Sequence, residues 1–200
     1  MGRHKEYDPT EALEGARKLF LERGFSATSV ADLAEATGLN KKSLYAEFGS
    51  KQELFESALL RHRQENNVRV VGPMETESAG LAEIRSALER WGRSGRGAAA
   101  GLGCLLCNTA SERSAQDPAA RKHVRAYLRR MTAAFRNALQ RAADRGELVD
   151  GVDIDAEAGF LASHAMGQLT LIRSKAMPEL VEPAARVALA HLDALEAGPP

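Results

Sequence analysis

Residues 28–51 constrain the fold of this chain most, because they contain the signals of two short helices separated by a tight turn. Ser29 is of the N-cap type, and apolar residues then recur at helical spacing until Gly38, which favours the end of a helix. Asn40 is a second N-cap residue, and Leu44 lies on the inward face of the helix that follows it. The segment therefore predicts two helices of about two turns each, joined by a turn.

The start of the second predicted helix carries lysine and hydroxyl side chains. Backbone N–H groups and the positive end of the helix dipole attract anions at such a position, and a helix is narrow enough to enter the major groove of DNA. We therefore predict a DNA interface in which Lys42, with Asn40 as a second candidate, reaches base edges, while the neighbouring residues hold phosphates. The complete set of predicted DNA contacts is Thr28, Ser29, Asn40, Lys41, Lys42, Ser43, Tyr45 and Lys51.

This segment resembles the helix-turn-helix of the tetracycline-repressor (TetR) family. The resemblance covers residues 8–60, is thin afterwards, and rests on Phe20, Gly24, Phe25, Thr28, Val30, Leu33, Ala34, Gly38, Leu44, Tyr45, Phe48, Ser50, Lys51 and Leu54. It implies an all-α fold of nine helices, with a three-helix helix-turn-helix DNA-binding domain at residues 6–66 and a ligand-binding and dimerisation domain at residues 67–200. It also implies a homodimeric regulator, a repressor, that binds a palindromic operator in double-stranded DNA and is released by an unidentified small-molecule inducer or by thiol modification.

Two residues depart from the family pattern. Ala46 and Glu47 stand where the family often carries a histidine and an aromatic or polar residue, so Ala46 removes one phosphate contact. The chain carries 27 basic and 27 acidic residues, so its overall field does not attract nucleic acid. DNA affinity must come from the placement of a few cations.

Capping signals and apolar periodicity predict helices in the rest of the chain, and no alternating strand pattern is present. Asp8-Pro9 opens a helix before the helix-turn-helix, and Ser50 opens a longer one that Gly72-Pro73 is expected to break. The glycine-rich residues 92–101 predict a mobile loop. The other expected helices cover residues 81–91, 104–112, 118–146, about 155–175 and 179–196.

The last two predicted helices have the composition of an assembly surface. Gly159, Ser163 and Gly167 follow one another at four-residue steps, so one helix face allows another helix to approach closely. Palindromic DNA needs two reading heads, which favours a homodimer built on a four-helix bundle. The alternative is that these helices pack only within one chain.

The segment from Gly101 to Glu112, GLGCLLCNTASE, resembles a GCLL-x-N-x-A-x-E motif of one branch of the family. Two interpretations of its cysteines compete. Cys104 is either a small apolar residue that packs a sensor helix, as buried cysteines usually are, or a thiol that an electrophile modifies and Cys107 resolves. Packing is the favoured interpretation, because reactivity depends on exposure that a sequence does not show.

An apolar set of residues with a few polar groups predicts a small-molecule pocket in either case. The candidates are Trp91, Leu105, Asn108, Phe135, Phe160, His164 and Gln168. His164 and Gln168 are one turn apart, and a polar contact across a dimer interface is an equal alternative for them. The five histidines do not cluster with the cysteines at zinc-like spacing, so we predict neither a metal site nor a cofactor.

A thiol-dependent enzyme that uses Cys104 is the rival hypothesis from another class of function. It lacks an evident base, since no histidine is adjacent in the sequence, so we expect the chain not to be an enzyme. No stretch has the roughly 20 apolar residues of a membrane span, and the N-terminus lacks a signal-peptide core, which predicts a cytoplasmic protein without a membrane partner. The sequence names neither the inducer, the operator nor the regulated genes.

Overall fold

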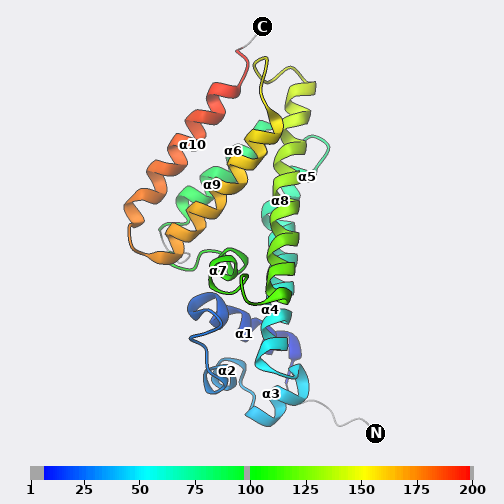
Figure 1. The fold of residues 1–200 in the computed structure, drawn as a ribbon, viewed down its shortest axis with the longest axis vertical. Helices are drawn as coiled ribbons and strands as arrows, with labels where there is room; N and C mark the ends of the chain where they lie inside the picture. The colour runs from blue at the N-terminus through cyan, green and yellow to red at the C-terminus, as the bar shows by residue number, and fades with distance from the viewer. Residues whose placement is uncertain (1–6, 97–99, 199–200) are drawn as a thin grey trace.

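The computed structural model describes residues 7–96 and 100–198, where the regular secondary structure is helical apart from one bridge between Leu148 and Glu196. Figure 1 shows an elongated molecule with α1, α2 and α3 at one end and the C-terminus at the other. The helices are α1 (Pro9–Arg23), α2 (Val30–Thr37), α3 (Lys41–Phe48), α4 (Lys51–Asn66), a π-helix (Asn67–Val71), α5 (Gly72–Glu75), α6 (Leu81–Arg93), α7 (Leu105–Glu112), α8 (Pro118–Asp144), α9 (Ile154–Ser174), a 3-10 helix (Pro178–Leu180) and α10 (Val181–Leu195).

The first helix packs on α4 and forms the base of the N-terminal part. The carboxylate of Asp8 accepts a hydrogen bond from the backbone N–H of Thr10 (2.7 Å), and Gly24 ends α1 with a φ of 79°. Buried Phe20 of α1 lies edge-on to Phe55 of α4, with 4.9 Å between the ring centroids. Such an aromatic pair contributes about 0.5–1.5 kcal/mol beyond the burial of its area.

The two helices of the turn have the caps that the sequence predicts. Ser29 and Asp32 form a capping box at the start of α2, and Gly38 ends it in the left-handed conformation with a φ of 69°. The side chain of Asn40 accepts from the N–H of Ser43 (2.9 Å) at the start of α3. The apolar residues of this turn that reach the core are Leu33, Leu39 and Leu44.

The helix after α3 continues through Gly72 and Pro73 as far as Glu75, so the predicted break was wrong. The π-helical turn before it lets the N–H of Gly72 donate to the carbonyl of Asn67. Pro73 has no N–H, and its ring would meet the carbonyl four residues earlier in a regular helix; the wider π turn accommodates it. With α4, the π-helix and α5 counted as one, and the 3-10 helix counted with α10 that it leads into, the described residues contain nine helices, as the family resemblance implied.

Four long helices build the C-terminal part, in which α6 packs against α10 and α8 packs against α9 (Figure 1). The short α7 lies between this bundle and the N-terminal helices, and contacts α1, α4, α8 and α9. Of the predicted loop at residues 92–101, the first two belong to α6, and 97–99 lie outside the described residues. No helix in the described part of the chain combines the length and the apolar character needed to cross a membrane.

Candidate functional site

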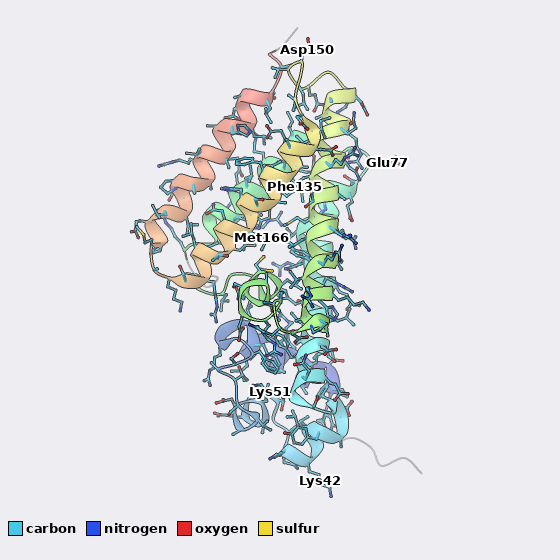
Figure 2. The ribbon with its side chains drawn as sticks, in the orientation of Figure 1. Lys42, Lys51, Glu77, Phe135, Asp150 and Met166 are labelled. Atoms are coloured by element: carbon cyan, nitrogen blue, oxygen red, sulfur yellow. The ribbon has the colours of Figure 1, made fainter. Side chains whose placement is uncertain are left out.

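The N-terminus of α3, residues 40–45, is exposed at the end of the molecule farthest from the C-terminus. Asn40, Lys41 and Lys42 are exposed, Ser43 is half-buried, and the side chain of Tyr45 is 38% exposed. Figure 2 shows Lys42 at the extreme tip, directed away from the helices behind it. The predicted cations therefore lie where a second molecule can reach them.

The backbone at this helix start also has free donors. The N–H of Ser43 is satisfied by the Asn40 side chain, and that of Leu44 by the Asn40 carbonyl (2.9 Å). Within the described part of the chain, no acceptor is recorded for the N–H groups of Lys41 and Lys42. Two free N–H groups, two ammonium groups and the helix dipole together favour an anion at this position.

The start of α2 contributes less than the sequence suggested. Thr28 is 1% exposed, and its hydroxyl donates to the carbonyl of Gly24 (2.6 Å), so the predicted phosphate contact by this side chain is corrected to a structural bond. The exposed Ser29 hydroxyl donates to the Asp32 carboxylate (2.6 Å). Thr28 was proposed from its position before a helix, which does not reveal that its side chain turns inward.

Lys51 lies on an aromatic ring and not at the tip. Its Nζ is 4.2 Å from the centroid of Phe25, and the guanidinium of Arg113 lies 3.8 Å from the same centroid. Burial, and then the nearby Arg113, lower the pKa of Lys51. Figure 2 shows Lys51 farther from the molecular end than Lys42. A phosphate contact by Lys51 therefore requires its side chain to leave Phe25.

The C-terminal end of α7 contacts the N-terminal part directly. The carboxylate of Glu112 accepts from the backbone N–H of Ser26 (2.8 Å) and of Phe25 (3.3 Å). These residues precede α2, and Gly24 leaves room for the carboxylate, since an added Cβ there would lie 2.7 Å from it. The last residue of the cysteine motif thus contacts the backbone that leads into the helix-turn-helix.

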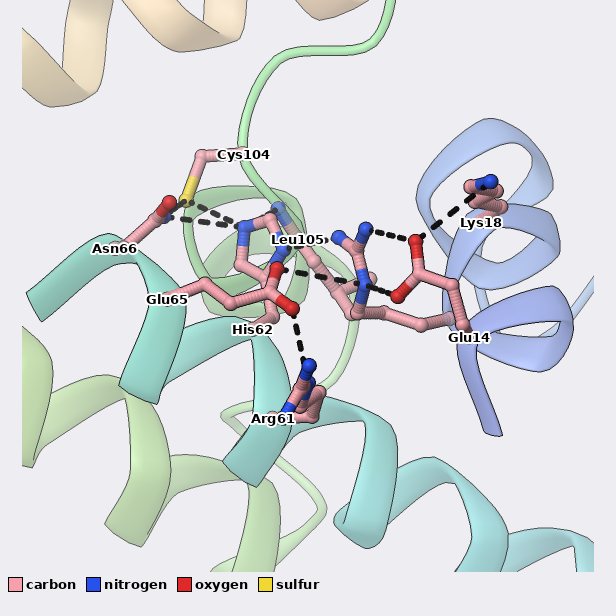
Figure 3. A network of polar contacts seen from close by, with 9 residues as sticks. Glu14, Lys18, Arg61, His62, Glu65, Asn66, Cys104 and Leu105 are labelled. Carbon is pink, nitrogen blue, oxygen red and sulfur yellow. Dashed lines mark hydrogen bonds and ion pairs between the residues drawn. The ribbon is translucent and has the colours of Figure 1, made fainter. Parts of the chain in front are cut away.

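The other end of α7 carries Cys104 as its N-cap residue, beside a histidine from α4 (Figure 3). The Cys104 Sγ lies 3.4 Å from Nε2 of His62 and 3.2 Å from Nδ2 of Asn66. Both cysteines are free thiols and both are buried. Sequence reasoning missed His62 because 42 residues separate it from Cys104. Its position three residues after buried Leu59 was the available sign that it faces inward.

Donors surround the imidazole of His62. Nη1 of Arg17 lies 3.0 Å from Nδ1, and the N–H of Leu105 lies 3.2 Å from Nε2. An arginine N–H and a backbone N–H are both donors, so each ring nitrogen of His62 faces a donor, and Nε2 also faces Sγ of Cys104. The amide of Asn66 donates to Sγ of Cys104, and a thiolate is a better acceptor for this bond than a thiol, so the arrangement favours the ionised form of Cys104.

The two thiols differ in acidity. A hydrogen bond with the Cys107 side chain lowers the pKa of Cys104 well below its ordinary value, and the hydrogen bond and charge of His62 add to the effect, although burial opposes it. The same thiol–thiol hydrogen bond, together with burial, raises the pKa of Cys107. Cys104 is therefore the more nucleophilic of the pair at neutral pH.

A cavity of about 290 Å³ lies beside Cys104, between α1, α4, α6 and the segment before α7. Of the residues predicted to sense a ligand, only Cys104 and Trp91 line it. Polar residues that the sequence analysis did not single out complete its wall: Arg17, His62, Glu65, Asn66, Arg69, Arg90, Ser94 and Tyr127. We call this space the Cys104 cavity.

Several predicted pocket residues serve the core instead. Phe135 is fully buried beside Trp91, with 6.2 Å between ring centroids. The Asn108 amide donates to the carbonyl of Leu102 (3.1 Å), and the Gln168 amide donates to the carbonyl of Val181 (3.0 Å). These two side chains bind neighbouring backbone segments, and neither of them lines the Cys104 cavity.

Phe160 and His164, which were predicted to line a small-molecule pocket, lie on the outer face of α9 and do not line the Cys104 cavity. Phe160 is 42% exposed, and its ring centroid lies 6.1 Å from that of His164. On the same helix, a Cβ added at Gly159 or Gly167 would have no atom within 4 Å. The predicted small-residue face of α9 is therefore open, and exposed Val187 of α10 extends its apolar character.

Comparison with known proteins identifies both halves of the chain. Residues 12–58 match "Bacterial regulatory proteins, tetR family", and residues 80–188, more than half of the chain, match "Tetracyclin repressor-like, C-terminal domain". The uncharacterized HTH-type transcriptional regulator YezE of Bacillus subtilis is 29% identical over 194 residues, which are 96% of this chain and 100% of YezE. The HTH-type transcriptional repressor ComR of Escherichia coli is 51% identical over 61 residues, 30% of this chain and 29% of ComR.

Solved structures show the same fold. A cysteine mutant of the TetR-family regulator CifR, complexed with 26-bp double-strand operator DNA, has a TM-score of 0.82 at 24% identity, covering 97% of this chain and 100% of that chain. The reduced form of NemR from E. coli has a TM-score of 0.79 at 21% identity, covering 95% and 97%. The chain therefore belongs to the tetracycline-repressor family of bacterial transcriptional regulators.

Proposed function

We propose that the chain is a repressor that binds operator DNA through the N-terminus of α3. The observation that carries this proposal is the exposed tip at residues 40–45, where free backbone donors and two lysines converge. Lys42 and Asn40 would reach base edges in the major groove, and Lys41, Ser43 and Tyr45 would hold phosphates. Relatives support the proposal, since ComR is named a transcriptional repressor and CifR is complexed with operator DNA.

The operator is a palindrome in this proposal, and the regulator is a homodimer. The open face of α9, with Gly159, Ser163, Gly167 and Phe160, together with Val187 of α10, would pack against the same face of a second copy. Such an isologous contact places two α3 helices around a two-fold axis, as half-sites one helical turn apart require. Sedimentation equilibrium tests it: Gly167→Leu should give monomers, whereas Gly198→Leu, at an exposed glycine where an added Cβ also meets no atom within 4 Å, changes a different surface and should leave the dimer intact.

Release from DNA would start at the Cys104 cavity, through a small molecule or through modification of the thiol. A ligand changes the population of a DNA-binding state only by its differential affinity for the two states. Two contacts connect this cavity to the N-terminal part: His62 with Arg17 of α1, and Glu112, at the other end of α7, with the backbone before α2. A displacement of α7 would therefore act on the backbone before α2 directly through Glu112, and would not require the hydrophobic core to rearrange.

The test is fluorescence anisotropy of the purified chain on labelled DNA from upstream of its own gene, titrated with salt. We expect affinity to fall linearly on a log–log plot as salt rises, because each phosphate contact releases counterions. If that DNA is not bound, selection from a random-sequence pool replaces it. Absence of any selected sequence would overturn the proposal.

A thiol-dependent enzyme is the second candidate, because His62 supplies the imidazole that the sequence did not show beside Cys104. The N–H of Leu105, the amide next to the thiol, already donates to His62 and is not free to stabilise an oxyanion. Incubation with an excess of an electrophile separates the two functions. One equivalent consumed per chain supports a switch, and continued turnover supports an enzyme.

A further inference from the structure

The Cys104 cavity has an unbalanced charge. Three arginines line it, Arg17, Arg69 and Arg90, with a single acidic residue, Glu65. Glu65 is paired with Arg61 at 2.9 Å and lies 3.7 Å from Arg17. The negative charge of the lining is therefore already neutralised.

Two of the guanidinium groups have no acidic partner. Arg17 pairs with Glu14 at 2.6 Å (Figure 3). Arg90 instead donates to the backbone carbonyl of Arg69 (2.7 Å), and neither Arg69 nor Arg90 forms an ion pair with any residue that the structure describes. The excess positive charge of the cavity thus belongs to these two arginines, and a hydrogen bond anchors the side chain of Arg90 to the backbone of Arg69.

We propose that the Cys104 cavity is a modification site for small anionic electrophiles, in which a carboxylate binds Arg69 and Arg90 while the adjacent reactive carbon meets Cys104. Guanidinium groups suit this role, because their planar donors match the two oxygens of a carboxylate. A volume of about 290 Å³ lies at the small end of ligand pockets, which selects compact molecules. This modification site extends the proposed release mechanism. Alkylation of Cys104 does not depend on that mechanism, and only the effect of alkylation on DNA binding rests on it.

The reaction at Cys104 is a displacement. The thiol first loses its proton to solvent, and the imidazole of His62 and the amide N–H of Asn66 face the sulfur. The sulfur electron pair then attacks the carbon, an S–C bond forms, and the carbon–halide bond breaks as the halide leaves with its electrons. Burial raises the pKa of Tyr127, which also lines the cavity, so its hydroxyl stays protonated and can donate to the bound anion.

Iodoacetate and iodoacetamide provide the test. Both alkylate a thiol with a group of similar size, but only iodoacetate carries a negative charge. The ratio of their alkylation rates at Cys104 is measured by mass spectrometry of the digested chain, and compared with the same ratio for N-acetylcysteine. We expect the cavity to raise the ratio in favour of iodoacetate by about tenfold, as two nearby cations should. The preference should shrink as salt rises.

Arg69→Gln and Arg90→Gln should each lower this ratio toward the value for N-acetylcysteine. Arg93→Gln is the matched control, because Arg93 is an exposed arginine of α6 that does not line the cavity. A wild-type ratio equal to that of N-acetylcysteine, or an unchanged ratio in both cavity variants, would overturn the inference. No DNA enters this experiment, so its failure leaves the operator-binding proposal intact, and failure to bind an operator leaves the alkylation result standing.

Discussion

The N-terminus of α3 and the Cys104 cavity are built from opposite kinds of sequence information. The α3 end comes from one continuous run of residues, in which Asn40 caps the helix that presents Lys42. The cavity joins α1, α4, α6 and the start of α7, so that Arg17 and Cys104, far apart in the chain, both contact His62. A surface encoded by one segment depends little on the rest of the fold, whereas the shape of a cavity built from several segments depends on how those segments pack.

The largest expected effect concerns the support of the α3 end. Leu44→Ala removes a leucine that is 1% exposed, and should lower the free energy of unfolding by about 2–5 kcal/mol. Urea denaturation followed by circular dichroism measures this. Leu60→Ala is the matched control, because Leu60 is 39% exposed and its truncation should cost less than about 1 kcal/mol. Equal losses in both variants would show that α3 does not pack as described.

The next effect tests the exposed tip directly. Lys42→Ala should weaken operator binding by about 1–3 kcal/mol and relax the choice of bases at one position in each half-site, with little change in stability. Anisotropy on a panel of single-base operator variants measures both quantities. Lys122→Ala, which removes an exposed lysine of α8, should leave the affinity unchanged. Equal affinity of the wild type and Lys42→Ala would place the DNA on another surface.

The difference between the two regions also explains what the sequence could predict. Ser29, Gly38 and Asn40 act within a few residues of themselves, so the helix-turn-helix and its caps could be located from the sequence. The π turn before Pro73 could not, because the predicted break assumed regular α-helical geometry. The small-residue face of α9 was also recognisable, since a four-residue repeat places its members on one face.

Contacts between distant segments stayed hidden. The sequence does not show that His62 lies beside Cys104, although its spacing from Leu59 places it on the apolar face of α4. The predicted pocket consisted of apolar and amide residues that were chosen for their residue type. In the structure these residues lie in the core or on the outer face of α9. Helical periodicity gives the inward face of each helix but not the neighbour that covers it.

A smaller effect tests how the two regions communicate. Glu112→Gln should weaken the contact with the N–H groups of Ser26 and Phe25 by about 1 kcal/mol, since a charged acceptor becomes neutral. We expect the reduced and alkylated proteins to differ less in operator affinity in this variant than in the wild type. Glu77→Gln changes an exposed glutamate at the side of the C-terminal part, in the upper half of Figure 2, and should leave that difference unchanged. An unaltered difference in Glu112→Gln would exclude this route.

The smallest effect is a change in pH dependence. Because the pKa of Cys104 is lowered, its thiolate persists to lower pH, and its alkylation should remain fast below the pH at which an ordinary thiol slows. His62→Gln should shift the rate profile to higher pH, because the imidazole no longer stabilises the thiolate. Alkylation by iodoacetamide across pH, with circular dichroism to verify folding, gives the profile. A His62→Gln profile identical to that of the wild type would remove His62 from the account of Cys104.

The central claim is that chemistry at the Cys104 cavity controls binding at the α3 end. The most direct measurement compares the operator affinity of the reduced chain with that of the chain carrying one alkyl group on Cys104, alongside Cys104→Ser treated in the same way. We predict that alkylation weakens binding by about tenfold or more, and that treated Cys104→Ser binds as its untreated form does. Equal affinities of the reduced and alkylated wild-type chains would contradict the claim.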